Sequence, residues 1–212
     1  MRTLASILLI LATSGCQSET DNASGPDTSN GSVVSGAGTG PFGIDLAKSP
    51  DELGAELLEG GKAEGIFHLK SVPRPSSEFT SYFLVAPDSK TICEVRAASK
   101  ELDGDSLGVQ VRSQVDELAQ ALSIKYGQSK KYDVCGGGDV SCQGQFWSMS
   151  VMNGERVYGY EWANPVSDAK IRNIAITVST TQFADPWYRL DYKTNDAGRC
   201  KIASQRARSK DL

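Results

Sequence analysis

A short apolar segment at the start of the chain sets the conditions in which the rest must fold. Residues 4–12, LASILLILA, follow one basic residue, Arg2, and lead into Ser14 and Gly15. A helix needs about 20 apolar residues to cross a bilayer core, so this segment is too short to span it. A basic start, a short apolar core and small residues at a cleavage point describe a secretory signal. We therefore predict that residues 1–15 are a signal peptide and that the mature chain folds in an oxidising compartment.

Cys16 directly follows this segment. The stretch LATSGC, residues 11–16, resembles the lipobox of bacterial membrane lipoproteins, with Thr13 where that family favours leucine. The resemblance implies cleavage before Cys16, a diacylglycerol on its thiol and a further acyl chain, such as palmitate, on its amine. It also implies a protein bound to the cell envelope by its lipid. Gln17 in place of aspartate implies the periplasmic side of the outer membrane if the organism has two membranes. The alternative is an ordinary signal peptide and an unmodified Cys16.

Lipidation of Cys16 leaves an even number of cysteines for the folded part. An even number in an exported domain indicates two disulfides, with three possible connectivities. One pair brackets GGGDVS, a glycine-rich segment that can close as a short loop without strain. We therefore predict one local bond and one long-range bond, which are Cys135–Cys142 and Cys93–Cys200.

Residues 16–41 are predicted to be a lipidated cysteine and a flexible tether. Ser, Gly, Thr and Asn dominate residues 17–40, which cannot bury enough apolar surface to offset the entropy of ordering. As a coil of 24 residues the tether would reach about 27 Å on average. The formal net charge of −4 gives no indication of nucleic-acid binding. Basic residues gather only at residues 199–210, where they could contact lipid headgroups, an anionic glycan or a partner, or simply be solvated.

Secondary structure is read from periodicity and turn residues. Ser49-Pro50-Asp51-Glu52 has the pattern of a capping box and predicts a helix that Gly60-Gly61 ends. Apolar residues three and four apart predict a second helix over residues 109–126, ended by Gly127. Alternation predicts six further strands, at residues 65–72, 79–86, 91–98, 172–180, 187–194 and 199–204.

The strongest local signal is QFWSMSVM-NG-ERVYGYEW, residues 145–162. Asn153-Gly154 is a favoured two-residue hairpin turn. A hairpin here would pair Trp147 with Tyr160 and place its aromatic side chains on one face. That face is predicted to be core packed under the second helix, although it could be a platform for a ligand.

These elements predict an α+β fold in one disulfide-stapled domain, residues 42–212. Its approximate halves, residues 42–104 and 105–212, would each contain a helix and an antiparallel meander. The layout is similar to that of small helix-plus-sheet lipoproteins of outer-membrane assembly, a likeness that assigns no site.

Several short motifs lack a part that their chemistry requires, so no catalytic residue, metal ligand or cofactor is predicted. His68 is the only histidine, which removes most triad and zinc arrangements. GTGPFG, residues 38–43, lacks the strand that a dinucleotide-binding turn requires. SDAK, residues 167–170, has no Lys-Thr-Gly after it. ELDGDSLG, residues 101–108, lacks the glycine and the final acid of a calcium loop.

The expected function is therefore a non-enzymatic cell-envelope lipoprotein that acts as a binding or scaffolding module. Its expected partners are the membrane, through the lipid, and an envelope protein. The first alternative is an inhibitor or immunity module that blocks an envelope enzyme. The second is a glycan-acting enzyme that uses carboxylates alone, which would need two acidic side chains across a cleft.

Overall fold

A computed structural model describes residues 38–210, all of which belong to one compact unit. Cys16 and the predicted signal peptide lie outside the described residues, as does most of the predicted tether. Gly38 to Gly43 are already packed, since Gly40 and Pro41 are buried and the Arg74 side chain donates to the Gly38 and Gly40 carbonyl oxygens. The folded domain thus begins at least as early as Gly38.

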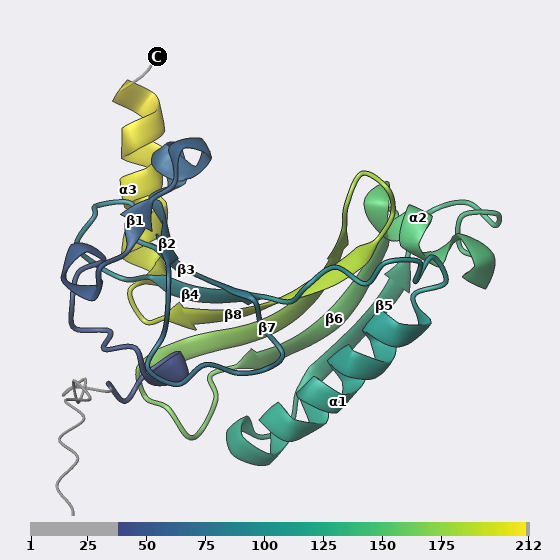
Figure 1. The fold of residues 1–212 in the computed structure, drawn as a ribbon, viewed down its shortest axis with the longest axis horizontal. Coiled ribbons are helices and arrows are strands. Elements are labelled where there is room, and N and C mark those ends of the chain that lie inside the picture. The colour runs from purple at the N-terminus through teal and green to yellow at the C-terminus, as the bar shows by residue number, and fades with distance from the viewer. Residues whose placement is uncertain (1–37, 211–212) are drawn as a thin grey trace, which may run out of the picture. The chain divides into compact units, whose positions relative to one another are not determined.

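The strands within residues 38–210 form one eight-stranded sheet, which confirms the mixed α+β class (Figure 1). Its order is β1-β2-β3-β4-β8-β7-β6-β5, and every neighbouring pair is antiparallel. Two meanders therefore join where β4 pairs with β8. The strands are β1 (Glu56–Leu57), β2 (Ile66–Leu69), β3 (Ser81–Val85), β4 (Glu94–Ala98), β5 (Lys130–Cys135), β6 (Arg156–Ala163), β7 (Ile171–Thr180) and β8 (Pro186–Thr194).

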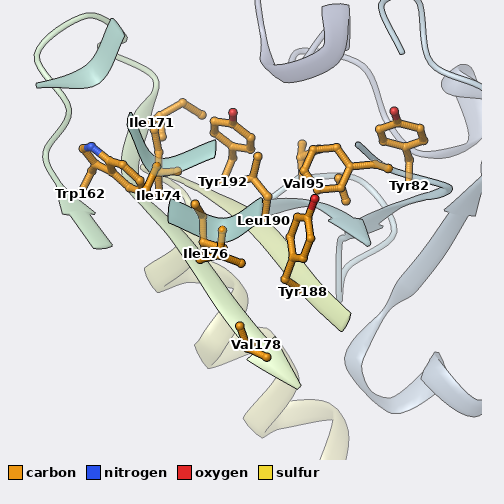
Figure 2. Packing of buried hydrophobic residues seen from close by; sticks show 14 of the residues in the cluster. Tyr82, Val95, Trp162, Ile171, Ile174, Ile176, Val178, Tyr188, Leu190 and Tyr192 are labelled. Atoms are coloured by element: carbon orange, nitrogen blue, oxygen red, sulfur yellow. The ribbon is translucent and has the colours of Figure 1, made fainter. Parts of the chain in front are cut away.

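One face of the sheet carries the core, because alternate residues of each strand point toward it. Figure 2 shows this face across β3, β4, β8, β7 and β6. Ile174 of β7 lies opposite Tyr192 of β8, which in turn lies opposite Val95 of β4. The alternation predicted for residues 172–180 and 187–194 is confirmed. The labelled core residues are Tyr82, Val95, Trp162, Ile171, Ile174, Ile176, Val178, Tyr188, Leu190 and Tyr192.

Helix α1 (Val109–Tyr126) packs on this core face and has the bounds that its periodicity predicts. Its own residues Val111, Val115 and Ala119 are buried on the side that faces the sheet. At its carboxyl end the Trp162 indole N–H donates to the Gly127 carbonyl at 2.9 Å, which ties the helix to β6.

The helix predicted after Ser49 does not form. The capping hydrogen bonds between Ser49 and Glu52 are present, but they support only the 3-10 turn η2 (Asp51–Leu53). Gly54 then takes a left-handed conformation, with φ of 67°, and ends the turn. The chain continues as β1 and the 3-10 helix η3 (Glu59–Glu64), so the first half lacks the helix predicted for it.

The hairpin predicted at residues 145–162 is also wrong in its first strand. Residues 147–152 form helix α2 (Trp147–Met152), which directly follows the 3-10 turn η4 (Gly144–Phe146). Another 3-10 turn, η1 (Pro41–Gly43), lies near the start of the described chain. β6 pairs with β5 instead, a strand that is not among those predicted from the sequence. Ser148 and Ser150 are buried while Met149 is exposed, the reverse of what strand alternation requires.

Residues 199–204, predicted to be a strand, lie in helix α3 (Ala197–Lys210). β8 is already paired on both sides, with β4 and β7, so no place beside it is open to another strand. The helix instead contacts η3, which connects β1 and β2.

Candidate functional site

The four cysteines expected to pair do so as predicted. Cys93–Cys200 links the residue before β4 to α3 across a sequence separation of 107 residues. Cys135–Cys142 closes the glycine-rich loop between β5 and η4. The first bond thus joins two distant elements, and the second fixes a local loop.

The acidic loop at residues 101–108 has a structural role. Asp105 is buried, and its carboxylate accepts hydrogen bonds from the backbone N–H groups of Val109, Gln110 and Val111 at 2.8–3.2 Å. These are donors that the first turn of a helix leaves without partners. Asp105 therefore caps α1, and negative charge is favourable at that helix end.

Other rejected motifs also have structural explanations. His68 lies on the face of β2 opposite the core, with its ring centroid 5.4 Å from that of Phe83. In GTGPFG a β-carbon on Gly38 would overlap the Asp45 backbone. Phe42 from the same motif packs on Tyr82 and Tyr192. The glycines are thus explained by close packing of the chain on itself.

Exposed apolar side chains gather at one end of the sheet. Of the fourteen large hydrophobic residues exposed within residues 38–210, nine lie in five segments that meet there. We call this surface the apolar tip, and its members are Leu107, Val109, Val134, Val140, Phe146, Met149, Met152, Val157 and Phe183.

Hydrogen bonds and strand pairing hold these segments together. Val134 lies opposite Val157 in the β5–β6 pair. The Ser148 N–H donates to the Ser106 carbonyl, which joins α2 to the segment before α1. The Gly104 N–H donates to Asp185, which brings in the β7–β8 turn. Figure 1 shows α2, the start of α1 and this turn at the same end.

Acidic residues predominate in the segments of the apolar tip. Arg112 and Arg156 are the basic residues there, and Arg156 is paired with Asp133 at 2.8 Å. The other acids in these segments are Asp103, Asp139, Glu155, Asp185 and the buried Asp105. A surface of this kind complements an apolar patch with a basic rim.

A second feature is a polar cleft of about 610 Å³ between α1 and two loops. Tyr188 is buried at its base and donates its hydroxyl hydrogen to Glu78 at 2.8 Å. Burial and this hydrogen bond raise the pKa of Tyr188. Glu78 comes from the loop before β3 and Glu117 from α1, so acidic side chains do share a cleft. The lining residues are Ser76, Ser77, Glu78, Thr80, Ser99, Lys100, Gln114, Glu117, Leu118, Ala121 and Tyr188.

A charged cluster ties α1 to β5 and β6. Asp116 accepts hydrogen bonds from the hydroxyls of Tyr158 at 2.5 Å and Tyr160 at 2.7 Å, and from the Lys131 ammonium at 3.1 Å. Burial would raise the pKa of Asp116, but these three donors outweigh it, and the pKa lies below its usual value. Burial, together with the bond to Asp116, raises the pKa of Tyr158 to about 12. The ionised carboxylate is thus the form that the fold stabilises.

We predict that Asp116→Asn lowers the free energy of unfolding by about 2 kcal/mol at pH 7. Hydrogen bonds to a charged group contribute about 1.5–3 kcal/mol to stability. We take the lower part of this range because the Asp116 side chain is 36% exposed and water screens its charge. Because its pKa is depressed in the fold, this contribution is present above the unfolded pKa of about 4 and is lost as the pH falls through the folded pKa.

Urea denaturation of both proteins at pH 7 and near pH 3 measures the effect. The difference between them should shrink at the lower pH. Asp51→Asn, at an exposed acid on η2, is the matched control and should stay within about 0.5 kcal/mol of wild type. A difference that does not change with pH would show that Asp116 acts through packing alone.

Comparison with protein families, curated proteins and solved structures finds no match to this chain. Within residues 38–210 no helix is long and apolar enough to cross a membrane. The same residues contain no group of three or more His, Cys, Asp or Glu side chains placed to hold a metal ion.

Neither the apolar tip nor the polar cleft is predicted from the sequence. On the strand predicted for residues 145–152, alternation would place Met149 on the same face as Trp147. Helical periodicity over residues 146–152 was the signal that could have placed Met149 outside. The cleft had no local signal, because Glu78 and Glu117 are 39 residues apart in the chain.

Proposed function

We propose that this chain is a non-enzymatic cell-envelope lipoprotein that docks a partner protein through its apolar tip. The observation that carries the proposal is the concentration of nine exposed apolar side chains on five segments at one end of the sheet. Single exposed apolar residues are ordinary on a protein surface, but nine of them concentrated at one end of the sheet indicate an interaction site. Met149 and Met152 add flexible, polarisable side chains that adapt to a partner.

The point at which the chain enters the described domain leaves the tip free for a partner. Gly38, the first described residue, belongs to the segment in which Phe42 packs on Tyr192. Tyr192 lies six residues along β8 from Pro186, or about 20 Å from the end of the sheet that bears the tip. The chain therefore enters the described domain away from the tip, so the tip does not overlap the point of entry. The acidic residues of the tip also disfavour an anionic bilayer as its target.

The disulfide loop gives the inhibitor or immunity alternative a specific basis. Val140 lies within the loop that Cys135–Cys142 closes, so part of the apolar tip is pre-organised. A rigid loop loses less conformational entropy on binding and therefore binds more tightly. Tight binding is what a small protein needs to block an enzyme. The identity of the docked protein, an assembly component or an enzyme, separates the two functions.

The lipid anchor is tested by metabolic labelling with a palmitate analogue. We expect the wild-type chain to incorporate label and Cys16→Ser to incorporate none, because the acyl chains depend on the cysteine thiol. Mass spectrometry of the mature wild-type chain should find no peptide from residues 1–15. Equal labelling of the two proteins would contradict the anchor.

The docking surface is tested by changing Met149 to aspartate. Burying an unpaired charge at an interface is costly, so Met149→Asp should lower recovery of the partner from solubilised envelopes by at least about tenfold. Ile124→Asp is the matched control, since Ile124 is exposed on α1 and lies outside the tip. Equal recovery with both variants would count against docking at the tip.

A further inference from the structure

The polar cleft beside α1 has a chemistry different from that of the apolar tip. Its volume of about 610 Å³ falls in the range of small-molecule sites. One wall is the helix, with Gln114 and Glu117, and the opposite wall is the loop with Ser77, Glu78 and Thr80. We infer that this cleft binds a neutral, hydroxyl-rich ligand, namely a short saccharide segment.

The hydrogen-bonding groups of the lining match such a ligand. Sugar hydroxyls both donate and accept, and each therefore needs partners of both kinds. Glu78 and Glu117 supply acceptors, the Lys100 ammonium supplies donors, and serine, threonine and glutamine side chains supply both. Leu118 and Ala121 provide an apolar strip against which the C–H groups of a sugar ring can pack.

The Glu78 carboxylate is oriented by a hydrogen bond from the base of the cleft. Its carboxylate accepts the hydroxyl hydrogen of Tyr188, a side chain that is only 1% exposed. A carboxylate has about four lone-pair sites, so most of its accepting capacity remains for a ligand. Orientation of one acceptor before binding lowers the entropy lost when a ligand is fixed.

Two other ligand classes fit less well. The lining carries two carboxylates and one ammonium, which disfavours phosphates and other anions. One common way to bind an extended peptide is to add it as a strand to an open sheet edge. Both β3 and β4, which flank the loops of the cleft, are paired on each side, so neither offers such an edge.

The test is a titration of the ¹⁵N-labelled mature chain with maltotriose and chitotriose, followed by backbone amide shifts. Saturable shifts at Ser77, Gln114 and Glu117 are expected with at least one saccharide at millimolar concentrations. Inorganic phosphate and trilysine should cause none there. Saturable shifts at these residues from trilysine or phosphate but from neither saccharide would overturn the assignment, as would no saturable shift from any probe.

Two variants locate the site without disturbing the core. Glu117→Gln and Gln114→Leu, both on the outer surface of α1, should weaken saccharide binding by about tenfold. Glu59→Gln, at an exposed glutamate on η3, should bind as the wild type does. Equal weakening in all three variants would contradict a site in this cleft. Because these residues lie outside the apolar tip, failure here leaves the proposed docking function standing.

Discussion

Replacement of Cys93 and Cys200 by alanine is expected to lower the free energy of unfolding by about 5 kcal/mol. The bond closes a loop of about 108 residues, and the chain-entropy estimate for so long a loop is about 4.8 kcal/mol. Both cysteines are buried, so their loss also removes packing between the start of β4 and α3. For a domain of this size the midpoint of thermal unfolding should fall by about 10–20 °C.

The Cys135→Ala, Cys142→Ala variant is the matched control. Its loop spans about eight residues, for which the same estimate gives about 2.5 kcal/mol, and the bond lies between partly exposed residues. Calorimetry of both double variants should therefore show that removal of the long-range bond lowers the free energy of unfolding about twice as much as removal of the local bond. Equal losses would contradict the distinction between a bond that joins distant elements and one that orders a loop.

The second large effect is expected at Trp147. Its side chain is 2% exposed and its ring lies edge-on to Tyr158 with centroids 5.7 Å apart. The Arg112 guanidinium lies over the ring at 5.4 Å, and a β-carbon at Gly108 would overlap it. Trp147→Ala should therefore lower the free energy of unfolding by about 3–5 kcal/mol.

Met149→Ala is the control, two residues away on the same short helix. Met149 is exposed, so its truncation should change stability by less than about 0.5 kcal/mol. On the strand predicted from sequence both side chains would lie on one buried face. Denaturant midpoints of the two variants therefore distinguish helix α2 from a hairpin strand. Similar losses of stability in both variants would favour the strand.

Long, strongly periodic elements were predictable because one face of each is buried. Helix α1 and strands β7 and β8 repeat apolar residues at helical or strand spacing over nine residues or more, so local sequence and tertiary packing agree. The pairing of the cysteines was predictable because the short glycine-rich loop favours a single local pair, Cys135 with Cys142, which leaves Cys93 to pair with Cys200.

Short segments were predicted poorly because their partners lie far away in the chain. FWSMSVM is consistent with either a strand or a helix turn, and length alone does not decide between them. The place beside β6 is taken by β5, whose sequence KKYDVC has few apolar residues because it forms an edge of the sheet. Lysines are common on such exposed edges, where they hinder pairing with other chains.

The candidate sites could not be predicted because exposure is a property of the assembled fold. The members of the apolar tip come from five segments, and only their arrangement leaves them outside the core. Asp105 illustrates the opposite case. In sequence it resembles part of a calcium loop, whereas in the fold its carboxylate accepts three backbone hydrogen bonds and caps α1.

The most direct test of the docking function is site-specific photo-crosslinking in intact cells. A photoreactive residue is placed at Met149 in the tip and, in a second strain, at Ile124 on α1. Both positions are exposed, so the two differ in location rather than in access to solvent. The docking function predicts one dominant crosslinked protein from position 149 and none from position 124. The same products from both positions, or a crosslink from position 124 alone, would contradict it.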